Sequence, residues 1–150
     1  MEIILYEPEI PPNTGNIARL CAALNLPLNL IEPLGFKIDD KHLKRAGLDY
    51  WPHVNLHVWP NWREFLSKWS GGQLWGTSAR TGHLYTGVNF SSGDGLVFGP
   101  ETRGLPENVK GDLHQLLRIP IRPQVRSINL STAVGLIAGE ALRQTGLWPQ

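Results

Sequence analysis

Apolar residues recur along the chain in two alternating patterns, which predict short strands and amphipathic helices in turn. Apolar runs at 3–6 and 28–31 have the length of buried strands. Between them, Pro11-Pro-Asn-Thr-Gly15 breaks the chain and supplies residues that cap helices. A helical stripe follows, made of Ile17, Leu20, Cys21 and Leu24. Arg19 lies roughly 160° around the helix from this stripe, so we expect it to point away from the core.

The same alternation continues to the end of the chain. Asn61 begins a sequence that resembles a capping box, and a helical apolar stripe follows it. The pattern predicts further strands at 54–58, 73–77, 96–98 and 117–119, and further helices at 39–46, after Asn61 and at 131–144. Strands that alternate with helices predict an α/β fold whose mainly parallel sheet is covered on both faces. Ligands of such sheets bind beyond the carboxyl ends of the strands.

Composition narrows the class of protein. The 150 residues fit a single domain, 1–150, and 41% apolar with 18% charged residues is a globular balance. No apolar run approaches the roughly 18 residues of a membrane helix, and the acidic start does not resemble a signal peptide. The lone Cys21 excludes an internal disulfide, and the five histidines lack metal-site spacing. We therefore expect a cytoplasmic protein with no metal and no membrane association.

The net charge of +1 does not itself indicate a nucleic-acid partner, but the basic residues are clustered. Lys41, Lys44 and Arg45 form one cluster. Arg118, Arg122 and Arg126 lie in a stretch without acidic residues. Such clusters either neutralise phosphates or are ordinary solvated surface charge, and charge alone leaves both interpretations open.

Three segments carry residues suited to ligand chemistry. In the first, Asn13-Thr-Gly-Asn-Ile-Ala-Arg19, a helix start offers backbone N–H groups to an anion, with Arg19 one turn inside. The ordinary interpretation is a turn in which Asn13 or Thr14 caps a helix. The second runs from Leu96 to Pro106, where glycine and proline make a tight loop that places Glu101 and Arg103 at the rim of the sheet.

The third segment, 118–131, leads into the last helix. Its two prolines fix the backbone, and Ser127, Asn129 and Ser131 are small polar residues at a helix entrance. Either Asn129 or Ser131 also suits a plain helix cap. Gly135 and Gly139 on the next helix allow another backbone to pack closely, from this chain or from a second copy.

Together, in this order and spacing, the segments resemble the three motifs of the SPOUT class of RNA methyltransferases. The motifs are N-T-G-N-I-A-R at 13–19, F-G-P-E-T-R-G-L-P at 98–106 and I-P-I-R-P-Q-V-R-S-I-N-L-S at 119–131. L-Y-E-P-E-I-P-P-N-T-G-N at the start and D-D-K-H-L-K-R-A-G-L-D-Y at 39–50 are similar to the minimal tRNA (cytidine/uridine-2′-O)-methyltransferases. Those enzymes act at the wobble position of leucine tRNAs, and the similarity spans essentially the whole chain.

The resemblance implies a doubly wound domain with a C-terminal trefoil knot, a homodimer, and S-adenosylmethionine (AdoMet) held by the knot loops. Cofactor contacts are expected at Thr77, Gly99, Gly104, Ile119 and Ser127. The residues that match catalytic and orienting positions are Arg19, Asn13, Glu101, Ser127 and Asn129. Without an additional RNA-binding domain, Lys41, Lys44 and Arg45 are expected to help hold the tRNA anticodon stem-loop, assisted by the second subunit.

The expected reaction moves the sulfonium methyl group to a ribose 2′-hydroxyl. Because an arginine side chain stays protonated in proteins, Arg19 suits a fixed positive charge better than a general base. Glu101 would orient Arg19 or accept the proton, while Ser127 and Asn129 align ribose and cofactor. Two alternatives remain, namely 2′-O-methylation of rRNA or of another tRNA site, and a non-catalytic RNA-binding module of the same fold.

Overall fold

A computed structural model describes residues 1–39, 41, 45 and 50–150, and seven strands among these residues form one sheet. In chain order the strands are β1 (Glu2–Tyr6), β2 (Leu28–Ile31), β3 (Leu56–Trp59), β4 (Leu74–Thr77), β5 (His83–Leu84), β6 (Gly95–Phe98) and β7 (Gln115–Arg118). Their order across the sheet is β3-β2-β1-β6-β4-β7-β5, and every pairing is parallel. The predicted parallel α/β sheet is confirmed.

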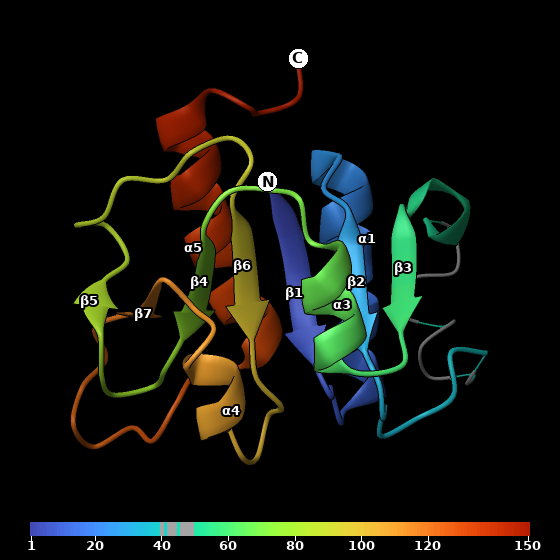
Figure 1. Ribbon diagram of the computed structural model, residues 1–150, viewed down its shortest axis with the longest axis horizontal. Helices are drawn as coiled ribbons and strands as arrows, with labels where there is room; N and C mark the ends of the chain where they lie inside the picture. The colour runs from blue at the N-terminus through green and yellow to red at the C-terminus, as the bar shows by residue number, and fades with distance from the viewer. Residues whose placement is uncertain (40, 42–44, 46–49) are drawn as a thin grey trace.

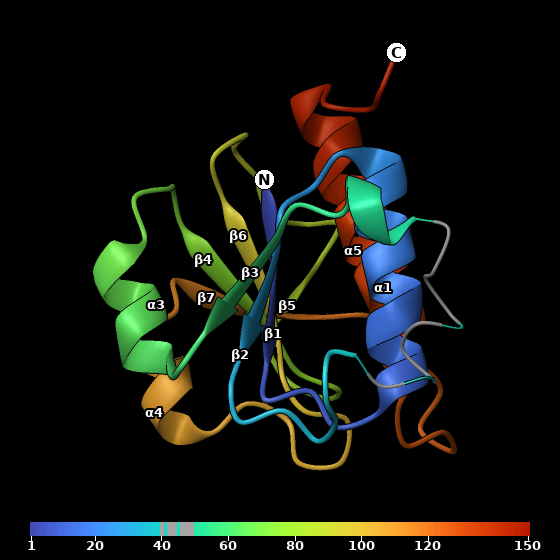
Figure 2. The same ribbon diagram turned by 90° about the vertical axis from the view of Figure 1, so that its right-hand side faces the viewer.

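Helices cover both faces of this sheet, as the alternating pattern predicts. The helical elements are α1 (Pro11–Leu24), η1 (Trp51–His53), α3 (Trp62–Lys68), α4 (Glu107–Lys110) and α5 (Leu130–Thr145). Figures 1 and 2 show α1 and α5 side by side on one face and α3 with α4 on the other. No helix of the described residues is long and apolar enough to cross a membrane.

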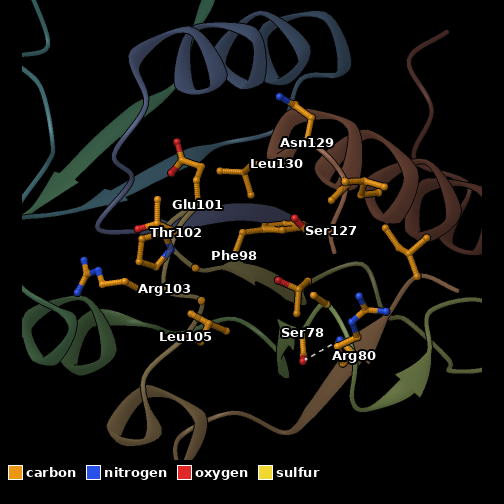
Figure 3. Close-up of a pocket in the computed structure, with 18 of the residues that line it drawn as sticks. Ser78, Arg80, Phe98, Glu101, Thr102, Arg103, Leu105, Ser127, Asn129 and Leu130 are labelled. Atoms are coloured by element: carbon orange, nitrogen blue, oxygen red, sulfur yellow. Dashed lines mark hydrogen bonds between the residues drawn. The ribbon is translucent and has the colours of Figure 1, made fainter. Parts of the chain in front are cut away.

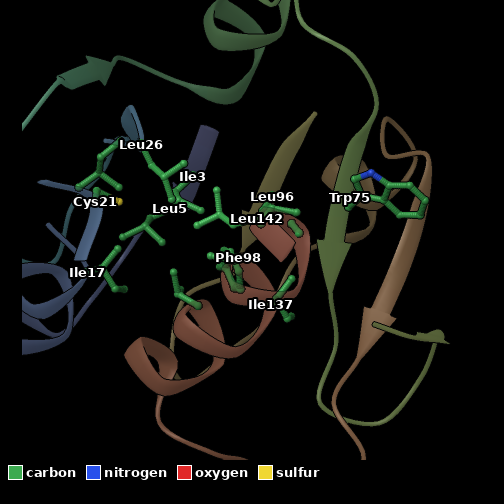
Figure 4. Packing of buried hydrophobic residues seen from close by; sticks show 14 of the residues in the cluster. Ile3, Leu5, Ile17, Cys21, Leu26, Trp75, Leu96, Phe98, Ile137 and Leu142 are labelled. Atoms are coloured by element: carbon green, nitrogen blue, oxygen red, sulfur yellow. The ribbon is translucent and has the colours of Figure 1, made fainter. Parts of the chain in front are cut away.

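Two apolar cores fill the space between the sheet and its helices. The larger core joins the inner faces of α1 and α5 to the strands, with Ile17, Cys21 and Ile137 fully buried (Figure 4). Burial raises the pKa of the Cys21 thiol to about 12, so Cys21 packs as a neutral apolar group. The smaller core packs Trp62 and Phe65 of α3 against the opposite face. The two cores fix the helix positions relative to the strand ends.

The differences from the predicted elements are local. Helix α1 begins at Pro11 with Ile10 at the N-cap, so the prediction that Asn13 or Thr14 caps it is wrong. The two prolines occupy the first helical positions, where a missing N–H costs nothing. The strand predicted at 54–58 begins only at Leu56, because the backbone N–H of Val54 closes η1. The helix predicted at 39–46 lies largely outside the described residues.

The strand register brings four chain segments to one edge of the sheet. Leu5 is paired with Phe98, and Thr77 with Leu117, so β1, β6, β4 and β7 all end at the same level. The next residues along the chain lie in the loops predicted to carry ligand chemistry. Strand order also changes direction here, because β1 lies between β2 and β6. This is the edge where open α/β sheets bind ligands.

Candidate active site

A cavity of about 800 Å³ opens at the carboxyl ends of β4, β6 and β7 (Figure 3). A volume of this size suits a ligand as large as a nucleoside. Residues from all three predicted segments line it, together with the start of the loop after β4. They include Asn13, Thr77, Ser78, Arg80, Phe98, Gly99, Pro100, Glu101, Thr102, Arg103, Gly104, Leu105, Lys110, Leu117, Ile119, Ile121, Arg126, Ser127, Ile128, Asn129, Leu130, Ala133 and Ile137.

All five residues expected at the cofactor are among these lining residues. The loop after β6 turns back so tightly that a Cβ on Gly99 would lie 2.5 Å from the backbone nitrogen of Leu105. Gly104, with φ of +69°, adopts the left-handed conformation that glycine favours. The two glycines therefore allow the loop to form one wall of the cavity.

The chemistry of the wall fits an adenosyl group. Phe98, Leu117 and Ile137 provide an apolar surface, and they are buried at the back of the cavity. The loops at 99–104 and 119–129 bring backbone polar groups and the Ser127 hydroxyl to its rim (Figure 3). An apolar surface with a few polar groups around it is the usual environment of a nucleoside-like ligand.

Glu101 lies at the N-terminus of α1 rather than beside Arg19. Its carboxylate accepts hydrogen bonds from the backbone N–H groups of Glu9 (3.0 Å) and Ile10 (2.7 Å), and from Asn13 Nδ2 (3.3 Å). Among the described residues, no ion pair joins Glu101 to Arg19, so the expectation that Glu101 orients Arg19 is not met. The carboxylate instead fixes the start of α1 and suits the positive end of the helix dipole.

Asn13 and Asn129 connect the three segments. Asn129 Nδ2 donates to Asn13 Oδ1 at 2.9 Å, while Asn13 Nδ2 donates to Glu101. Asn129 also caps α5, because its Oδ1 accepts from the backbone N–H groups of Ser131 (2.9 Å) and Thr132 (3.3 Å). Asn13 is 7% exposed, so these amide bonds are shielded from water. Asn129 therefore caps α5 and also lines the cavity, while its role in the reaction stays a prediction.

A reciprocal pair of contacts joins segments 7–10 and 101–103. The Glu9 carboxylate accepts from Thr102 N (3.0 Å) and Thr102 Oγ1 (2.8 Å), while Glu101 accepts from the Glu9 backbone. The bonds from Thr102 lower the pKa of Glu9, which stays ionised at neutral pH. On the other side, Gly35 packs so closely that a Cβ there would lie 2.7 Å from the Glu9 carbonyl oxygen. Sequence reasoning did not identify Glu9 or Thr102, because each contact spans more than 90 residues.

Arg19 does not line the cavity. It is exposed on α1, and its guanidinium carbon lies 4.6 Å from the centroid of the Tyr50 ring. Arg19 lies six positions after Asn13. This separation corresponds to roughly 9 Å along the helix axis and a rotation of roughly 240° around it. Asn13 therefore faces the cavity and α5, while Arg19 faces outward.

The predicted RNA-binding residues that the structure describes lie on the surface. Lys41 and Arg45 are exposed, while Lys44 lies outside the described residues. A separate set of basic side chains lines the cavity, namely Arg80, Arg103, Lys110 and Arg126. Of these four, only Arg126 belongs to a basic cluster noted in the sequence. Within the described part of the chain, no group of three or more His, Cys, Asp or Glu residues could hold a metal ion.

With this geometry in place, comparison with known proteins identifies the family. A profile of the SpoU rRNA Methylase family matches residues 1–139. The chain belongs to the SpoU methylase family. This membership confirms the resemblance that the three motifs carry.

Curated relatives of this SpoU-family chain match it over nearly their full length. The tRNA (cytidine(34)-2′-O)-methyltransferase of Aeromonas hydrophila is 50% identical over 148 residues, which cover 97% of this chain and 95% of the relative. The protein of the same name from Escherichia coli (strain K12) is 47% identical over 148 residues, with 97% and 94% covered.

Solved structures agree with the fold. One that concerns the 2-OH methylation of C/U34 on tRNA has a TM-score of 0.91 at 49% identity, and the match covers 95% of this chain and 94% of that chain. The SpoU methyltransferase AviRb from Streptomyces viridochromogenes, in complex with AdoMet, has a TM-score of 0.84 at 22% identity, with 96% and 60% covered. At that identity the second match shows the shared fold.

The geometry predicts that Glu101 stabilises the fold of the site. Glu101→Gln replaces one acceptor oxygen by an amide that faces a backbone N–H, so we expect the free energy of unfolding to fall by about 1–3 kcal/mol. Urea denaturation measures this loss. Glu107→Gln is the matched control, because Glu107 is 92% exposed and only pairs with Lys110 at 3.5 Å. Unchanged stability together with lost methyl transfer would instead favour Glu101 as a proton acceptor.

Proposed function

We propose that this protein is an AdoMet-dependent methyltransferase that modifies the ribose 2′-hydroxyl of the wobble cytidine or uridine of tRNA, including leucine tRNAs. One observation carries the proposal: Asn13 joins all three family motifs by hydrogen bonds around a single nucleoside-sized cavity. The names of the relatives that match the whole chain support the position and the chemical group. A tRNA substrate would place the enzyme in the cytoplasm.

In this proposal the cavity holds AdoMet, with Thr77, Gly99, Gly104, Ile119 and Ser127 around it. When bound, AdoMet supplies an electrophilic methyl group. The apolar side chains exclude water from the back of the cavity. Asn129 and Ser127 orient the ribose at the rim, while the Glu101 carboxylate holds the helix start on which Asn13 lies. Since Glu101 already accepts three hydrogen bonds, it suits this positioning role better than proton transfer.

Arg19 would stabilise the negative charge that develops on the 2′-oxygen as its proton leaves. Because Arg19 faces away from the cavity of its own chain, we propose that it acts on the cavity of a second copy in a homodimer. Support comes from the outward face of α5, where Leu136 is 42% exposed and a Cβ on Gly135 would meet nothing within 4 Å. Leu147 and Trp148 are also exposed, and the Trp148 ring lies beside Gly139 of α5.

We also propose the trefoil knot that the family resemblance implies. Long-range contacts support it, because the loop between β4 and β6 contacts the chain on both sides of segment 119–129. Before that segment, Arg118 Nε donates to the Gly82 carbonyl (3.2 Å), and after it Gln144 Nε2 donates to the Val88 carbonyl (2.9 Å). Within it, Arg80 donates to the Val125 carbonyl at 2.6 Å. Such contacts suit a loop that encircles the last segment.

A knotted path can be tested by covalent closure, since both termini lie at the same end of the molecule (Figures 1 and 2). Ligation of the native termini should trap the knot, so the denatured circle should have a smaller radius of gyration than a circle of the same chain ligated while unfolded. Small-angle scattering in strong denaturant measures both. Equal radii would contradict the knot.

The proposed reaction predicts methyl transfer from labelled AdoMet to the ribose of nucleotide 34. Purified protein incubated with unmodified tRNA should yield 2′-O-methylcytidine or 2′-O-methyluridine after digestion, located at position 34 by mass spectrometry. Ribosomal RNA serves as the parallel substrate. Label on a base, on rRNA or at another tRNA site would contradict the proposal. Calorimetric binding of AdoMet without any transfer would favour a non-catalytic module.

The proposed dimer predicts complementation between two inactive variants. Arg19→Ala should lose about 10²–10³-fold in kcat, as expected when one oxyanion-stabilising donor is removed. Ile119→Trp should fill the cavity and abolish AdoMet binding. Random pairing of the two should restore about a quarter of the wild-type activity, because one site in each mixed dimer is intact. The mixture is prepared by co-expression with two tags and assayed with tRNA. An inactive mixture would contradict action across the dimer.

A further inference from the structure

The guanidinium of Arg19 rests on an aromatic ring. Its central carbon lies 4.6 Å from the centroid of the Tyr50 ring, within the range of a cation–π contact. Arg19 itself is exposed on α1 and Tyr50 is half-buried. Tyr50 ends the motif D-D-K-H-L-K-R-A-G-L-D-Y, in which only the basic residues were given a role.

The turn that follows Tyr50 fixes the backbone from which its ring projects. The Tyr50 carbonyl accepts a hydrogen bond from the backbone N–H of His53 at 2.9 Å, which closes η1. Trp51 and Val54 pack against the larger core, and η1 packs against α1. The backbone that carries the ring is therefore held against the core and α1, whereas the arginine side chain is long and has four rotatable bonds.

Stacking decides which way the arginine can bind. When a guanidinium lies over an aromatic ring, its N–H donors remain free at the edge of its plane. Two of those donors can then bind a phosphate or an alkoxide oxygen as a fork. The guanidinium keeps its charge, and the ring limits the orientations of the arginine side chain before the anion binds.

We infer that Tyr50 is a positioning residue, which holds the Arg19 guanidinium so that its edge is presented to an anionic group of the RNA ribose-phosphate backbone. This inference rests on the proposed function, in which Arg19 stabilises charge at the reacting oxygen. Tyr50 acts through Arg19 and needs its ring face rather than its hydroxyl. Phenylalanine should replace it, whereas aliphatic side chains should not.

The test is a double-mutant cycle with two readouts. Tyr50→Leu should lower kcat with saturating tRNA about two- to fivefold, the effect expected from loss of a cation–π contact at an exposed site. The AdoMet affinity measured by calorimetry should change less than about twofold, because Tyr50 does not line the cavity. Tyr50→Phe should keep most of the activity. In an Arg19→Ala background, Tyr50→Leu should cost nothing further.

Nuclear magnetic resonance tests the contact between Arg19 and Tyr50 without any measurement of activity. In the free enzyme, the Arg19 Nε–H resonance should carry the ring-current shift of a nearby aromatic face in wild type and Tyr50→Phe, and lose it in Tyr50→Leu. Arg63→Ala removes an exposed arginine on α3 and is the control for the loss of surface charge in Arg19→Ala. If Tyr50→Leu fails to fold, Tyr50→Met keeps a side chain of similar length without a ring face and replaces it in every arm.

Three results would overturn the inference. They are equal activity of Tyr50→Leu and Tyr50→Phe, an equal loss from Tyr50→Leu with and without Arg19, and no ring-current shift in the wild type. The second result would mean that the ring acts on RNA independently. Full activity of Arg19→Ala would instead contradict the proposed role of Arg19, and the resonance would still report whether Tyr50 holds it.

Discussion

The side-chain amide of Asn13 is the interaction on which the arrangement of the site depends. It accepts from Asn129 and donates to Glu101, so one nearly buried group joins the start of α1, the loop after β6 and the cap of α5. Glu101 also accepts from the backbone just before α1, and Asn129 also caps α5. A buried amide that lost either partner would keep an unpaired polar group, which is costly in a shielded site. The walls of the cavity are therefore positioned together.

The carboxylates beside this amide show how charge is used to build the site. Glu9 and Glu101 each accept hydrogen bonds from the other's segment, and Glu101 lines the cavity. Because their oxygens accept hydrogen bonds from backbone N–H groups, they hold the two segments together. The charges available to a polyanionic substrate are those of the basic side chains that surround the cavity, among them Arg80, Arg103 and Arg126.

The sequence alone predicted the parallel sheet, both helical layers and nearly all strand positions, because buried strands and amphipathic stripes are local patterns. Four of the five candidate catalytic residues that the family resemblance implied line the cavity, as do all five residues expected at the cofactor. The sequence did not predict the bonds from Thr102 to Glu9, or the outward direction of Arg19 relative to the cavity. The first depends on the pairing of distant segments and the second on where the cavity lies relative to α1, and no local pattern encodes either. The roles of these residues in catalysis stay predictions.

The contacts of Asn129 also have a consequence for the order of folding. Asn13 and Asn129 are separated by 116 residues, and Asn13 and Glu101 by 88. Contacts between such distant residues close large loops, and loop closure slows the formation of the structures that need it. During synthesis Asn129 therefore leaves the ribosome long after Asn13. The core between α1 and the first strands can form earlier, while the cavity must wait for the final helix.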